Sequence, residues 1–191
     1  MRATSIALRD SSMNLWLRLV WYLVRVQFLA RIVLPGGYSA LLFRVWPTDL
    51  DTSLHMNNGR YLTIMDLGRL DFMVRTVLWR PLLKHRWTPI ASGIQIRFRR
   101  ELRSFERFRL ETRIVAWSEA AVVMEQQFLF DGGPRDGQVA ARALFKGGLY
   151  DRKAKTFVTM LRLMAELGVE PVAPELTPEV EAFLKADSAL R

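Results

Sequence analysis

The chain has 191 residues, 50% of them hydrophobic, which is enough to bury one substantial core and too few for two ordinary domains. It contains no cysteine, which excludes disulfides, thiolate metal sites and a cysteine nucleophile, and with 2 histidines a conventional zinc site is not expected. The net charge of +9 favours an anionic partner, and nucleic acid, acidic lipid and a phosphate-bearing cofactor all fit this charge.

The first stretch of the chain, residues 13–35, is apolar and rich in tryptophan but is interrupted by arginines. Arg18, Arg25 and Arg31 follow one another at spacings that place them within about a third of the circumference of a helix. Arg25 near the centre argues against a transmembrane span, and the arginines also argue against a secretory signal. We therefore predict a basic amphipathic helix that ends at residues 35–37 and either lies on an anionic membrane surface or caps the core.

The pattern changes after the Gly-Gly pair, where the main domain is expected to begin. Residues 38–46 predict a first strand, and residues 58–79 predict a helix that is buried on nearly all sides, because apolar side chains surround it. Pro81 and Pro89 bracket a stretch that we interpret as a basic loop, which contains His85.

The second half of the main domain alternates apolar and polar residues, which is the signature of strands with one covered face. This alternation predicts four antiparallel strands, at residues 94–98, 107–116, 122–130 and 138–150. A last helix is expected at about residues 159–167 and is closed by a glycine. A short helix near residues 178–185 belongs to a tail that we expect to be peripheral.

This order of elements predicts an α+β fold in which one antiparallel sheet wraps around one long central helix. An extra amphipathic helix is expected at the N-terminus. The predicted organisation is a helical segment at residues 1–37, a main domain at 38–168 and a C-terminal tail at 169–191.

The most polar part of the main domain lies between its first strand and its buried helix. It carries the pattern Asp-x-x-x-His-x-Asn-Asn-x-x-Tyr, formed by Asp51, His55, Asn57, Asn58 and Tyr61. The pattern and its place in the element order resemble the hotdog-fold thioesterases of the 4-hydroxybenzoyl-CoA thioesterase and plant acyl-carrier-protein thioesterase kind. Within that group, the chain most resembles the THEM6-like branch, which has a similar hydrophobic N-terminus. The resemblance covers about residues 38–168.

The resemblance implies a hotdog domain that hydrolyses acyl-CoA or acyl-carrier-protein thioesters without a metal or a cofactor. It also implies a homodimer or a dimer of dimers with the acyl-thioester sites at the dimer interface. An acid at the Asp51 position would act as nucleophile or general base, and amides around Asn57, Asn58 and Gly59 would polarise the thioester carbonyl. The alternative is a hotdog protein that binds acyl chains or a membrane surface without catalysis.

The chemistry of the residues supports this interpretation independently. Thioester hydrolysis needs a base or nucleophile for the carbonyl carbon and hydrogen-bond donors for the oxyanion that develops. An acid just before a helix N-terminus, as Asp51 is expected to be, lies beside unpaired amides that favour negative charge. His55 could orient the carboxylate or contact the substrate, and Asn58 could bind a water or the carbonyl. Tyr61 is a further candidate for contact with the substrate.

Other interpretations remain open for several of these residues. Asp49 and Asp51 could be ordinary turn acids that accept bonds from their own backbone, and Asn57 could serve only as a helix cap. Asp66 lies on the buried helix three residues before Arg69, so an ion pair is its simplest role. Because some hotdog branches draw their catalytic carboxylate from this helix, Asp66 is the second candidate for that role.

Three further residues bear on the candidate site. Ser53 stands where the plant enzymes carry a catalytic asparagine, which weakens a direct transfer of their mechanism. Ser92 and Gly93, at the start of the next strand, could contact the acyl group or form a bulge.

Arginines are dense in the predicted strands between residues 97 and 113. The aromatic residues there follow the apolar phase of the alternation, whereas a base-stacking platform would expose them, so we expect no nucleic-acid partner. The arginines form either a solvated sheet face or a site for the phosphates of coenzyme A. We expect a cytoplasmic protein, with peripheral membrane contact through the N-terminal helix as an alternative.

Overall fold

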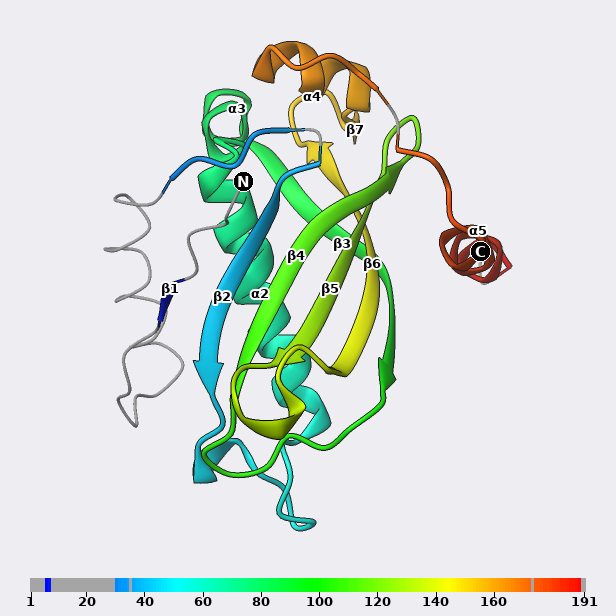
Figure 1. The fold of residues 1–191 in the computed structure, drawn as a ribbon. Helices are drawn as coiled ribbons and strands as arrows, with labels where there is room; N and C mark the ends of the chain where they lie inside the picture. The colour runs from blue at the N-terminus through cyan, green and yellow to red at the C-terminus, as the bar shows by residue number, and fades with distance from the viewer. Residues whose placement is uncertain (1–5, 8–29, 35, 173, 190–191) are drawn as a thin grey trace.

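A curved β-sheet with a long helix against one face dominates the computed structural model, which describes residues 6–7, 30–34, 36–172 and 174–189 (Figure 1). The strands are β1 (Ile6–Ala7), β2 (Tyr38–Arg44), β3 (Trp87–Phe98), β4 (Arg107–Trp117), β5 (Val122–Phe130), β6 (Val139–Asp151) and β7 (Thr156–Phe157). The helices are α2 (Asn58–Arg75), α3 (Trp79–His85), α4 (Met160–Leu167) and α5 (Pro178–Ser188), with 3-10 turns at Pro47–Asp49 and Gly133–Arg135.

The sheet has the strand order β1-β2-β4-β5-β6-β3, and β7 pairs with β6. The pairings among β2, β4, β5, β6 and β3 are all antiparallel, whereas the short β1 runs parallel to β2. The predicted strand alternation and the α+β class are therefore confirmed. Since β4, β5 and β6 follow one another in sequence, short turns connect them.

The helix α2 lies against one face of the sheet, which we call the inner face; the opposite face is the outer face. Its N-terminus is capped by Asn57, whose side-chain oxygen accepts a hydrogen bond from the Gly59 amide. The core between α2 and the inner face contains Leu41 and Leu110 from neighbouring strands, which pair in register, together with Phe128. Burial of these apolar side chains fixes α2 on the sheet.

The helix predicted for residues 58–79 ends at Arg75, earlier than predicted. Val77 has a φ of 64°, which is left-handed and breaks the α-helix. A separate helix, α3, then stands where a basic loop was predicted. Pro81 fits it because the first turn of a helix has no intrahelical partners for its amides. Pro89 lies in β3, which is an edge strand and therefore tolerates a proline.

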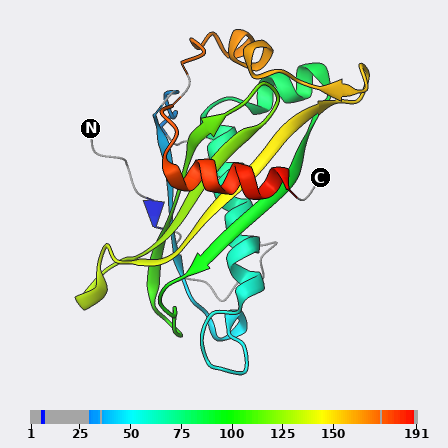
Figure 2. The same ribbon diagram turned by 90° about the vertical axis from the view of Figure 1, so that its right-hand side faces the viewer.

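The two C-terminal helices pack on different parts of the molecule. α4 runs from its cap Thr159 to Gly168, which adopts the left-handed conformation, as predicted. α5 crosses the outer face of the sheet (Figure 2) and is not peripheral as we expected, since Val180 and Phe183 are buried against β4 and β5. Ion pairs join α5 to β6: Arg142 with Glu179, and Lys146 with Asp187.

Most of the predicted N-terminal helix lies outside the described residues. Residues 30–34 are described and are not helical, so a helix cannot extend to Pro35 as predicted. Their backbone groups pair instead with the end of α2: the Ala30 carbonyl accepts from Arg75 Nε at 2.9 Å, and the Ile32 amide donates to the Arg75 carbonyl at 3.0 Å. Within the described part of the chain, no helix is both long and apolar enough to span a membrane.

Gly68 provides a test of how closely α2 approaches the sheet. A Cβ atom at this position would lie 2.6 Å from Leu110 Cδ2, 2.7 Å from Thr112 Oγ1 and 2.9 Å from Gln126 Nε2. Helix propensity alone predicts that Gly68→Ala stabilises the protein by roughly 1 kcal/mol. We expect instead a loss of about 1–3 kcal/mol in the free energy of unfolding, because the helix must move away from the sheet. Urea unfolding measures the difference, and a stabilised variant would contradict the packing described above.

Candidate active site

Asp49 begins the motif loop, residues 49–57, which connects β2 to α2, and its contacts join the two ends of this loop. Asp49 is 4% exposed, and its carboxylate accepts a hydrogen bond from the Trp46 amide at 2.9 Å and faces Arg60 Nε at 3.4 Å. Its carbonyl accepts from the Asn57 amide at 2.9 Å. Asp49 therefore holds the two ends of the loop together beside the start of α2.

Asp51 and His55 face each other across this loop. Asp51 Oδ1 accepts a hydrogen bond from the Ser53 amide at 2.8 Å, and Asp51 Oδ2 lies 3.5 Å from His55 Nδ1. Leu54 between them has a φ of 62°, which marks a tight turn. The turn interpretation of Asp51 is realised, and its second carboxylate oxygen lies beside an imidazole in a partly exposed position. The catalytic role of Asp51 and the orienting role of His55 stay predictions.

The start of α2 has fewer available amides than the sequence suggests. Asn57 Oδ1 accepts from the Gly59 amide at 2.8 Å, and the Asn57 carbonyl accepts from the Arg60 amide at 2.8 Å. Asn57 thus acts as a helix cap, and the Gly59 amide is engaged by that cap. Asn58 is the first residue of the helix. The predicted polarisation of a carbonyl by these amides stays a prediction.

Tyr61 belongs to the core rather than to an open surface. It is 3% exposed, and its ring makes edge contacts with Phe98 and Phe128, each with centroids 4.9 Å apart. Burial raises the pKa of Tyr61 to about 12, the charges of Glu101 and Glu106 act in the same direction, and a backbone hydrogen bond at Leu102 acts against them.

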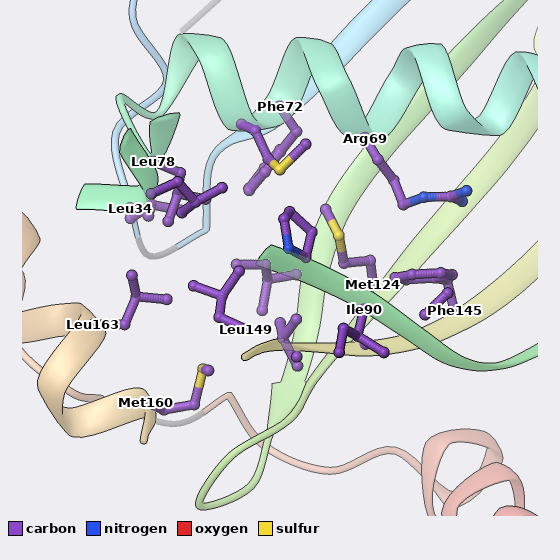
Figure 3. A pocket seen from close by; sticks show the side chains of 18 of the residues that line it. Leu34, Arg69, Phe72, Leu78, Ile90, Met124, Phe145, Leu149, Met160 and Leu163 are labelled. Atoms are coloured by element: carbon purple, nitrogen blue, oxygen red, sulfur yellow. The ribbon is translucent and has the colours of Figure 1, made fainter. Parts of the chain in front are cut away.

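An apolar cavity of about 280 Å³ lies beside the C-terminal half of α2 (Figure 3). Its walls come from α2, α3, α4, the inner face of the sheet and Leu34. The lining residues are Leu34, Asp66, Arg69, Phe72, Met73, Leu78, Leu82, Pro89, Ile90, Ala91, Ile114, Val122, Met124, Phe145, Gly147, Gly148, Leu149, Met160, Leu163, Met164 and Leu167. Asp51, His55 and the helix-start residues are absent from this lining.

The charged side chains that line the cavity, Asp66 and Arg69, form an ion pair on α2. Arg69 Nη1 also donates to Gln126 Oε1 at 2.7 Å, and the guanidinium lies over the Phe145 ring, 4.1 Å from its centroid (Figure 3). Burial lowers the pKa of Arg69, and the Asp66 carboxylate partly offsets that effect. The Asp66 side chain is 71% exposed, so this lining residue of the cavity is open to solvent.

Gln126 fixes this arrangement from the middle of the sheet. Its side chain is fully buried and donates from Nε2 to the Met65 carbonyl at 2.9 Å and to Thr112 Oγ1 at 3.0 Å. Its oxygen accepts from Arg69. Gln126 was not among the site residues predicted from the sequence, although its place as a polar residue on the covered face of the third predicted strand could have identified it.

The helices α3 and α4, which both line the cavity, are joined by a polar clamp. Lys84 Nζ donates to Glu166 Oε2 at 2.9 Å, and His85 Nε2 lies 2.9 Å from Glu166 Oε1. The hydrogen bond from Lys84 lowers the pKa of Glu166, and His85 adds to this effect. Since the pKa is depressed, the Glu166 carboxylate stays charged at neutral pH and loses its charge, and with it this contribution to the clamp, as the pH falls through the lowered pKa.

Ser92 and Gly93 are not among the lining residues of the cavity, although Ala91 before them is. The strand pairing shifts register between Ala91 and Gly93, so Ser92 occupies a bulge, and its hydroxyl donates to the Lys146 carbonyl at 3.2 Å. A Cβ at Gly93 would lie 2.7 Å from Asp187 Oδ1, which places this residue beneath α5 on the outer face. Their predicted contact with the acyl group stays a prediction.

The structure thus separates the candidate residues into two groups, one at the N-terminal end of α2 and one further along this helix. Asp51, His55, Asn57, Asn58 and Gly59 gather in and just after the motif loop, and Asp66 lies with Arg69 at the cavity. Within the described ranges, no three His, Cys, Asp or Glu side chains are grouped so that they could hold a metal ion. What the second group offers chemically is a carboxylate, a guanidinium and an apolar chamber side by side.

Comparison with known proteins decides the family. The model of the thioesterase-like superfamily matches residues 45–185, which include the motif loop, α2, the strands β3 to β7 and most of α5. The chain belongs to the thioesterase-like superfamily.

Among curated relatives, it is 35% identical over 120 residues to Protein THEM6 of Xenopus laevis, covering 58% of this chain and 56% of that protein. It is 29% identical over 132 residues to Protein THEM6 of Drosophila melanogaster, covering 69% and 64% respectively. The chain thus matches less than two thirds of the length of these relatives.

Solved thioesterase structures share the curled sheet and its helices. YbaW of Escherichia coli, described as a probable thioesterase, matches with a TM-score of 0.62 at 21% identity, over 67% of this chain and 94% of YbaW. An Asp-to-Asn mutant of 4-hydroxybenzoyl-CoA thioesterase, complexed with 4-hydroxybenzoyl-CoA, matches with a TM-score of 0.61 at 14% identity, over 68% and 97%. These matches support the predicted hotdog architecture of the sheet in this superfamily member.

The buried phenol of Tyr61 predicts a pH dependence of stability. Because its pKa is raised from 10.0 to about 12 in the folded protein, the native state keeps a proton that the unfolded chain loses above pH 10. Stability due to this group is therefore fully present below pH 10 and is lost as the pH rises towards 12, by about 2–3 kcal/mol in total. Urea unfolding across this range should show a shallower decline for Tyr61→Phe than for the wild type. The same substitution at the exposed Tyr38 is the control, and equal slopes for wild type and Tyr61→Phe would contradict the assignment.

Proposed function

We propose that the protein hydrolyses acyl thioesters and that the reacting carbonyl lies at the Asp66–Arg69 end of the apolar cavity. The observation that carries this proposal is the ion pair of Asp66 and Arg69 on the lining of a cavity that is otherwise apolar. In a member of the thioesterase-like superfamily, such a cavity suits an acyl group, and its charged rim suits the thioester.

The two charged side chains can supply both parts of the chemistry. The Asp66 carboxylate removes a proton from a water molecule, whose oxygen attacks the thioester carbonyl carbon. The Arg69 guanidinium carries five N–H groups, of which the bonds to Asp66 and Gln126 use part, and it stabilises the oxyanion. The carbon–sulfur bond then breaks, Asp66 passes the proton that it took from the water to the thiolate, and a carboxylic acid and a free thiol leave.

Asp51 is the competing carboxylate. It precedes α2, and its orientation by the Ser53 amide and His55 would suit a base or nucleophile. Because Asp51 is not among the lining residues of the cavity, a thioester held next to it would place the acyl group elsewhere. Measurement must therefore separate Asp51 from Asp66.

We also propose a homodimer formed through β3. This strand lies at the edge of the sheet, so backbone groups along one side have no neighbouring strand among the described elements. Ile94 and Phe98, on the inner-face side of β3, are each 42% exposed, which is unusual for large apolar side chains in a strand. A second copy paired along β3 would cover them. We further propose that the substrate is an acyl-CoA and that the protein makes peripheral contact with a membrane.

The carboxylate is identified by comparing Asp66→Asn with Asp51→Asn. We expect Asp66→Asn to lower kcat for acyl-CoA hydrolysis by about 100-fold or more, because the amide cannot take up the proton of the attacking water. We expect Asp51→Asn to lose less than about tenfold, as it removes no base from the cavity rim. Thiol release from a series of acyl-CoA substrates measures both variants.

Asp131→Asn is the matched control, since it removes a carboxylate from an ion pair with Arg107 and Asp131 belongs to neither candidate group. It should retain wild-type activity. A greater loss in Asp51→Asn than in Asp66→Asn would move the reaction to the motif loop. A wild-type protein that binds acyl-CoA but releases no thiol would instead support the non-catalytic acyl-binding alternative.

A further inference from the structure

The cavity beside α2 is built for a particular kind of acyl group. We infer that it takes the chain of a linear aliphatic acyl thioester, with α4 closing one wall over that chain, rather than a hydroxylated aromatic ring. This inference rests on the proposed function for the identity of the ligand as a thioester, but it concerns what the cavity binds and not whether hydrolysis occurs.

The lining of the cavity is the first line of support. Of its 21 described residues, Asp66 and Arg69 are charged and lie at one rim, and the other side chains carry only carbon and thioether sulfur. Four of the 8 methionines in the chain are among them: Met73, Met124, Met160 and Met164. Methionine side chains are flexible and adapt to irregular shapes. A lining of this type suits a chain with many conformations more than a rigid ring.

The distribution of polar groups argues against a hydroxyaryl ligand. A buried hydroxyl that finds no hydrogen-bond partner weakens binding considerably, and sites made for such groups provide a partner. Asp66 and Arg69 already bond each other, and Arg69 also bonds Gln126. They lie where the thioester itself is expected, so the far end of the cavity offers a ring hydroxyl no polar side chain among the described lining residues.

The volume of the cavity, about 280 Å³, leaves room for an alkyl chain of several carbons, since a single water molecule needs only about 10–15 Å³ of such a cavity. The helix α4 forms one wall of the cavity with its buried apolar residues Met160, Leu163 and Met164. Glu166 of the same helix pairs with Lys84 of α3. Changes on α4 should therefore alter the space available to the chain.

Two positions on α4 give a matched test. Leu163 lines the cavity and is 7% exposed, whereas Leu161 on the same helix is 68% exposed and lies outside the cavity lining. Leu163→Trp fills the cavity, and Leu163→Ala enlarges it; the same substitutions at Leu161 are the controls. Two thioethers that cannot be hydrolysed, S-decyl-CoA and S-(4-hydroxybenzyl)-CoA, serve as probes for calorimetric binding to the full chain.

We expect S-decyl-CoA to bind at least about tenfold more tightly than S-(4-hydroxybenzyl)-CoA, because the aryl hydroxyl loses its water without gaining a partner. Leu163→Trp should weaken S-decyl-CoA binding by about tenfold or more and favour shorter alkyl chains, because the indole occupies their space. Leu163→Ala should favour longer chains, which keeps the inference testable if the tryptophan variant does not fold. Both Leu161 variants should bind as the wild type does.

Equal or tighter binding of the aryl probe would overturn the inference, as would equal effects at Leu161 and Leu163. The binding results and the proposed hydrolysis are tested separately. Alkyl-selective binding without any thiol release from decanoyl-CoA would contradict the proposed hydrolysis and support an aliphatic acyl site. Release of thiol from 4-hydroxybenzoyl-CoA together with weak S-decyl-CoA binding would support the proposed hydrolysis and contradict the aliphatic selectivity of the cavity.

Discussion

The buried side-chain amide of Gln126 is the contact on which the candidate site depends. It joins three parts of the fold: the Met65 carbonyl of α2, the Thr112 hydroxyl of β4 and the Arg69 guanidinium at the cavity. A buried polar group without partners costs about 1–3 kcal/mol, so satisfying every hydrogen-bonding atom of this amide favours one position of α2 on the sheet. Gly68 allows the helix to lie close enough for these bonds to form. The orientation of Arg69 is thereby set by the core and not by the solvent.

The position of α2 gives its two halves different surroundings. Its N-terminus emerges from the motif loop, where Asp49 and Asn57 make the structural bonds and Asp51 faces His55. Its C-terminal half borders an apolar chamber whose charged rim is the Asp66 ion pair. Family membership makes thioester chemistry the natural proposal for this chamber, and the cavity adds where the acyl group would lie.

Much of this architecture could be predicted from local patterns. The alternation of apolar and polar residues predicted the antiparallel strands, and residue type predicted Asn57 and Gly168 as helix caps. What could not be predicted depends on tertiary contacts: the left-handed conformation of Val77 splits the predicted helix, and Val180 and Phe183 of α5 are buried against strands far away in sequence. The bond of Arg69 with a residue 57 positions further along the chain was beyond any local pattern. The resemblance rests on the motif loop, which is continuous in sequence. The cavity could not be predicted, because its lining residues are spread between Leu34 and Leu167 and meet only in the folded chain.

The most direct test is a structure of the protein with a thioester analogue in which a ketone replaces the scissile group of decanoyl-CoA. The account predicts that the alkyl chain fills the cavity between α2, α3 and α4. The ketone oxygen should lie within hydrogen-bonding distance of the Arg69 guanidinium, with the Asp66 carboxylate beside the carbonyl carbon. A ketone bound next to Asp51, with the alkyl chain outside the cavity, would contradict it.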